Sequence, residues 1–159
     1  MTTTSTTRPA GVLPAEAGKQ GGHPVLLATL GVPFDDAART FAVDSALESG
    51  QILIVANITR LEPLPLSVRL GYDSLDEFTP ELSKAIRAPA ELAHSLGVRV
   101  ERLRVRSPRP VTALLQLARE RAPGLLVFGP ERTSLPLRRY QRAVRAVRRG
   151  APCLVWLPH

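Results

Sequence analysis

Three short apolar runs constrain the fold of this chain more than any other feature. They span residues 25–30, 51–58 and 125–128, and polar and apolar residues do not alternate regularly within them. Such runs are typical of strands in a parallel sheet, because helices cover both faces and bury both sets of side chains. The segments between them carry apolar residues at helical spacing. The sequence therefore predicts an α/β fold in which strands alternate with helices through right-handed crossovers.

The whole pattern predicts five strands and four helices in the order βαβαβαβαβ, as an open parallel sheet with helices on both faces. Arginines interrupt the third strand, which favours a place near an edge of the sheet. The expected strands are 25–30, 51–58, 98–106, 125–128 and 153–157, and the expected helices are 35–49, 79–96, 111–118 and 137–149. Ligands of such sheets bind beyond the carboxyl ends of the strands where the strand order reverses. The turns after Leu30 and Phe128 are therefore the expected site.

The chain of 159 residues has the length of one domain. Residues 1–22 are rich in threonine, lack apolar periodicity and are interpreted as a flexible tail before a single domain at 23–159. Residues 60–78, with Pro63, Pro65, Gly71 and several acidic side chains, are expected to form a long connection. No apolar run approaches the roughly 20 residues of a membrane helix or forms a signal peptide, so we expect a cytoplasmic protein without a membrane partner.

Charge is distributed unevenly along the chain. The formal net charge is +7, yet residues 98–159 contain 14 arginines and only 3 acidic side chains, whereas residues 1–97 are acidic overall. A basic half attracts phosphates, nucleic acid or acidic protein surfaces. The chain has 19 arginines and 2 lysines, so a general codon preference for arginine is an alternative explanation.

Several short motifs along residues 23–157 together resemble the universal stress protein family. Ala151, Pro152 and Cys153 precede the last predicted strand, and the strand at 125–128 ends in Gly129. The resemblance implies the five-stranded fold of adenine-nucleotide-binding α-hydrolase-like proteins. It also implies a homodimer in which the last strands pair across a two-fold axis, with the dimer edge at Leu154, Val155 and Trp156.

The same resemblance locates the family's ATP site, where this sequence departs from the family pattern. Members that bind ATP carry an aspartate at the end of the first strand and the pattern G-x2-G-x9-G, followed by Ser or Thr, after the fourth. The corresponding positions here are Leu30 with Gly31, then Gly129, Arg132, and Gln141 or Arg142. Loss of the aspartate and of two glycines argues against ATP binding in the family's usual way, so no cofactor is expected. The alternative is a nucleotide-binding switch, at most a slow ATPase, in which arginines around Gly129 hold the phosphates.

The last predicted helix carries a basic face. Arg138, Arg142, Arg145 and Arg149 lie at i, i+4, i+7 and i+11 and share one side of the helix. A solvated helix face is one interpretation, and a surface for an acidic protein partner is the other. Nucleic acid is not expected as a partner, because aromatic side chains are not interleaved with the arginines.

No residue pattern indicates a metal site or a catalytic centre. The three histidines lack ligand spacing, and Cys153 at the start of a strand is interpreted as a small apolar residue. Asp35 and Asp36 resemble paired carboxylates but are better explained as a helix cap and a partner of the helix dipole. The leading hypothesis is therefore a non-enzymatic regulatory or binding protein of the universal stress type.

Overall fold

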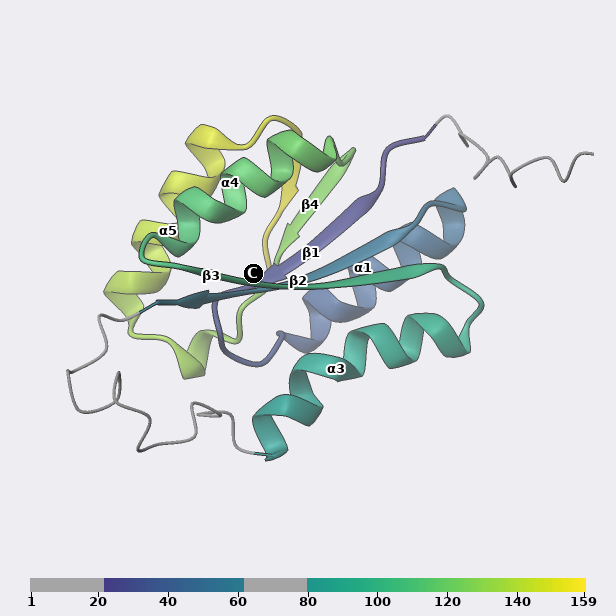
Figure 1. Cartoon of the computed structure of the whole chain (residues 1–159), viewed down its shortest axis with the longest axis horizontal. Helices are drawn as coiled ribbons and strands as arrows, with labels where there is room; N and C mark the ends of the chain where they lie inside the picture. The colour runs from purple at the N-terminus through teal and green to yellow at the C-terminus, as the bar shows by residue number, and fades with distance from the viewer. Residues whose placement is uncertain (1–21, 62–79) are drawn as a thin grey trace, which may run out of the picture.

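The computed structural model describes residues 22–61 and 80–159. Their elements follow the predicted alternation of strands and helices (Figure 1). The strands are β1 Val25–Thr29, β2 Leu53–Arg60, β3 Val100–Ser107, β4 Leu125–Phe128 and β5 Leu154–Trp156, and the helices are α1 Asp36–Ser49, α3 Pro80–Ser95, α4 Pro110–Arg121 and α5 Leu137–Gly150, with a short 3-10 turn η1 at Arg132–Ser134. None of the described helices is long and apolar enough to cross a membrane.

All five strands are parallel and stand in the order β3-β2-β1-β4-β5. Helices α4 and α5 lie on one face of the sheet, and α1 and α3 lie on the other (Figure 1). The strand order reverses between β1 and β4, since the chain builds outward from β1 to β3 and then crosses to β4. The predicted α/β class and five-stranded parallel sheet are confirmed.

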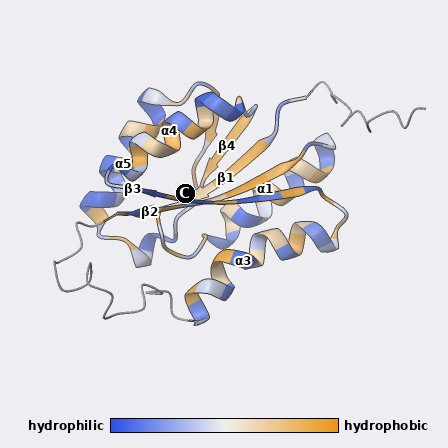
Figure 2. Cartoon of the chain, viewed as in Figure 1, coloured by the Kyte–Doolittle hydropathy of each residue, from blue (hydrophilic) through white to orange (hydrophobic). Residues whose placement is uncertain are grey.

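The core consists of two apolar layers, one on each face of the sheet. Alternate strand residues enter opposite layers: Leu26 packs toward α4 and α5, and Leu27 packs toward α1 and α3. Figure 2 shows the central strands as the most apolar part of the chain. Strands β1 and β4 lie in the middle of the sheet, and their side chains are almost all buried. This two-sided burial explains the unbroken apolar runs in the sequence.

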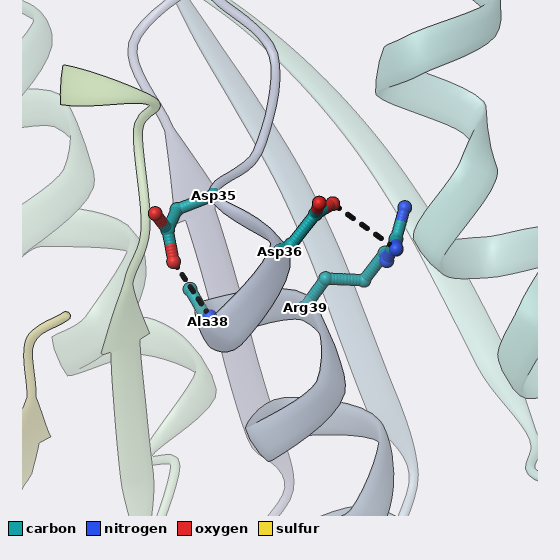
Figure 3. A network of polar contacts seen from close by, with 4 residues as sticks. All are labelled: Asp35, Asp36, Ala38 and Arg39. Carbon is teal, nitrogen blue, oxygen red and sulfur yellow. Dashed lines mark hydrogen bonds and ion pairs between the residues drawn. The ribbon is translucent and has the colours of Figure 1, made fainter. Parts of the chain in front are cut away.

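Helix α1 begins with a side-chain cap. The Asp35 carboxylate accepts a hydrogen bond from the Ala38 N–H at 3.0 Å, and Asp36 pairs with Arg39 at 3.1 Å (Figure 3). The cap satisfies one of the N–H groups that a helix start leaves without a partner. The structural interpretation of this acidic pair is confirmed.

The two edges of the sheet differ in chemistry. Edge strand β3 exposes Arg102, Arg104 and Arg106 on alternate positions, as the interrupted pattern predicted. Edge strand β5 is short and apolar, and 71% of Leu154 is exposed. The predicted tail and most of the predicted connection at 60–78 lie outside the described residues, and β2 continues two residues beyond its predicted end at 58.

Candidate functional site

The loops that follow β1 and β4 are hydrogen-bonded to each other. Asp35 N–H donates to the Gly129 carbonyl and Glu131 N–H donates to the Pro33 carbonyl, both at 2.9 Å. These bonds flank an antiparallel bridge between Phe34 and Pro130. On the face of the sheet covered by α1, backbone hydrogen bonds therefore join the carboxyl ends of β1 and β4, where the strand order reverses.

A cavity opens at the same end of the sheet on the α4 and α5 side. Its volume is about 600 Å³, and Leu30, directly after β1, forms part of its wall. The rest of the described lining comes from the end of β2, from the turn before α4 and the first turn of α4, and from Pro136 and the part of α5 up to Ala146. The cavity is notable for its guanidinium groups, since five arginines line it: Arg60, Arg109, Arg138, Arg139 and Arg142.

No acidic side chain neutralises these arginines within the part of the chain that the structure describes. The described lining contains neither Asp nor Glu. The ion pairs found among the described residues, Arg39 with Asp36 and Arg121 with Glu101, lie elsewhere. Like charges that share one cavity repel one another, so an anion in this cavity would be stabilised by them.

Two helix N-termini at the cavity add to its positive character. Neither α4 nor α5 has a side-chain cap or an acidic residue in its first turn, in contrast to α1. Their cap residues, Arg109 and Pro136, both line the cavity. Backbone N–H groups and the helix dipole at such ends favour anions.

Internal contacts hold Leu30 and Gly31, where the resemblance predicts the family's aspartate position. Leu30 is 4% exposed and belongs to the apolar layer under α4 and α5. Gly31 adopts a left-handed backbone conformation (φ +73°), and its N–H donates to the Asn57 side-chain oxygen at 2.9 Å. The position that the resemblance assigns to the hydrogen-bonding carboxylate therefore carries a buried apolar side chain.

Apart from Arg142, the positions that the resemblance assigns to the glycine pattern lie outside the described lining of the cavity. A Cβ on Gly129 would lie 2.3 Å from Cβ of Ala38, so this glycine permits close contact between β4 and α1. The Arg132 guanidinium lies over the ring of Tyr140, 5.6 Å from its centroid. Neither of these residues nor Gln141 is among the described lining. Of the positions predicted for the ATP site, the described lining brings together only Leu30 and Arg142.

The predicted basic face of α5 divides into two parts. Arg138 and Arg142 line the cavity, and Arg145 and Arg149 are exposed farther along the helix. An acidic partner for the exposed part stays a prediction. No sequence pattern marked Arg60 and Arg109 as site residues, although each lies two or three positions beyond the carboxyl end of a predicted strand, where ligands of such sheets bind.

The described residues contain no group of His, Cys, Asp and Glu that could hold a metal ion. Burial raises the pKa of the Cys153 thiol, against a smaller lowering by a backbone hydrogen bond at Leu126. A raised pKa keeps the thiol protonated and weakly nucleophilic at neutral pH.

Comparison with known proteins agrees with this fold. A universal stress protein in complex with cAMP is 25% identical (TM-score 0.57), over 87% of this chain and 97% of the other. A universal stress family protein from Burkholderia pseudomallei is 19% identical (TM-score 0.60; 89% and 98% covered), and one from Archaeoglobus fulgidus in complex with dAMP is 20% identical (TM-score 0.57; 85% and 96% covered). No curated protein sequence matches the chain. The model of the universal stress protein family matches residues 22–157, and the chain therefore belongs to that family.

Proposed function

We propose that this protein is a non-enzymatic regulatory member of its family that binds an anionic small molecule in the arginine-lined cavity. The observation that carries the proposal is the convergence of five arginines and two uncapped helix starts on one cavity whose described lining has no acidic residue. Arginine binds phosphate and carboxylate through two parallel hydrogen bonds, so guanidinium groups take the role that glycine-loop N–H groups have in the family pattern.

The same lining supports a binding role and not a catalytic one. The described wall offers one hydroxyl, on Thr112, and no His, Cys, Asp or Glu that could serve as its base. Nucleophilic catalysis requires a nucleophile within hydrogen-bond reach of such a base. We therefore expect binding without turnover.

Thermal unfolding with sodium pyrophosphate tests the proposal. In EDTA at low ionic strength, pyrophosphate at a hundredfold excess over its Kd should raise the stability of the full chain by about 2.7 kcal/mol. Arg142→Gln should reduce this rise, and Arg148→Gln, an exposed residue of the same helix outside the cavity lining, should retain it. No rise in the unaltered protein, or equal loss in both variants, would contradict the proposal.

ATP provides a second arm of the same experiment. Phosphates held by arginines alone need no metal ion, so ATP in EDTA should raise the melting temperature at least as much as ATP with Mg²⁺. A rise that requires Mg²⁺ would indicate binding in another manner and would count against an arginine-only site.

A further inference from the structure

The arginines of the cavity fall into two groups that come from opposite sides of strand β1. Arg60 ends β2, and Arg109 lies between β3 and α4. Arg138, Arg139 and Arg142 lie on α5, which connects β4 to β5. Because β1 stands between β2 and β4, Leu30 at the end of β1 separates the two groups.

Each group has its own helix start. The cap position of α4 is Arg109, and the first turn of α5 contains Arg138 and Arg139. The described surface that is not guanidinium is mainly apolar, with Val111 of α4 and Ala143 of α5 among its residues. The topology thus places one arginine group on each side of β1, and the remaining described lining is mainly apolar.

Charge balance favours more than one anionic group. The five guanidinium groups carry a charge of +5. One phosphate group carries about −1.5 to −2 at neutral pH, so a single phosphate leaves most of this charge uncompensated and two come close to balancing it. A cavity of about 600 Å³ lies within the size range of small-molecule sites.

From this arrangement we infer that the ligand carries phosphate groups at two separate ends of an uncharged body, one end for each arginine group. The inference rests on the proposed function, since it specifies the ligand class of the same cavity. A ligand whose two phosphates are adjacent, such as pyrophosphate, can bind one arginine group with both phosphates but cannot span the cavity to bind both arginine groups fully.

Calorimetric titration of the full chain in EDTA tests the inference with three probes. Adenosine 3′,5′-bisphosphate presents two separated phosphates, adenosine 5′-monophosphate presents one on the same body, and pyrophosphate presents two that adjoin. The bisphosphate should bind at least about tenfold more tightly than either other probe, because it alone gains charged hydrogen bonds at both ends.

Variants on each side of the cavity show whether both ends are used. Arg109→Gln and Arg142→Gln should each weaken binding of the bisphosphate about tenfold. Only one of the two variants should strongly weaken binding of the monophosphate. Arg60→Gln provides a second variant for the first group, and Arg148→Gln is the matched control. All four side chains belong to exposed residues, so the fold should persist.

The outcomes separate the two proposals. If pyrophosphate and the monophosphate bind and the bisphosphate binds no more tightly, the two-ended ligand is wrong and the anion site stands. The same conclusion holds if substitutions in only one group of arginines weaken binding of the bisphosphate. If none of the probes binds, or if Arg148→Gln weakens binding as much as the cavity variants, the proposed function fails as well.

Discussion

At the scale of single residues, Gly129 shows how the absence of a side chain permits close packing. Its missing side chain permits Ala38 of α1 to approach β4, because an added Cβ would lie 2.3 Å from Cβ of Ala38. We expect Gly129→Ala to lower the free energy of unfolding by about 1–3 kcal/mol through overpacking. Urea unfolding measures the loss.

A double variant identifies the cause of that loss. Ala38→Gly removes the opposing methyl group and alone costs about 1 kcal/mol of helix stability. If the steric contact is the cause, Gly129→Ala should cost much less in the Ala38→Gly background, because the effects of contacting residues do not add. Strictly additive losses would show that Gly129 is required for another reason.

At the scale of elements, the arginines at the start of α5 favour an anionic ligand and oppose the dipole of the helix. Its first turn contains Arg138 and Arg139 and no acidic residue. Positive charge near a helix N-terminus is unfavourable, whereas negative charge there stabilises. We expect Arg138→Glu to raise the free energy of unfolding by about 0.3–1 kcal/mol at low ionic strength and to abolish the response to pyrophosphate.

Arg148→Glu is the control for this prediction, because it makes the same change of charge in the last turn of the same helix. There the dipole favours positive charge, so the variant should be less stable, and its response to pyrophosphate should persist. Equal stability changes of the same sign in both variants would show that net charge, and not position on the helix, determines the effect. Urea unfolding at two salt concentrations measures the change in free energy of unfolding for both variants. Because salt screens charge, each change should be smaller at the higher concentration.

At the scale of the whole molecule, the sequence predicts the fold more completely than the site. Each predicted strand and helix has a local cause, such as the unbroken apolar run at 125–128 or the cap at Asp35, so local sequence patterns predict these elements. The cavity depends on which strand ends become neighbours. Arg60 and Arg109 lie 49 positions apart in the sequence, and no local pattern joins them to α5. The family pattern located Arg142 and Leu30, but it could not show that Arg132 lies over Tyr140.

The contrast between the two sheet edges predicts how the molecule associates. Strand β3 exposes arginines at alternate positions, which oppose pairing with a second sheet, whereas β5 exposes Leu154 beside the stacked rings of Trp156 and Phe41, whose centroids are 4.6 Å apart. We expect a homodimer through β5, as the family resemblance implies. Leu154→Glu should convert it to a monomer in sedimentation velocity, because unpaired charge would then enter the interface. Leu47→Glu, on an exposed leucine of α1, should leave the dimer intact. A monomeric unaltered protein, or dissociation by both variants, would place the contact elsewhere.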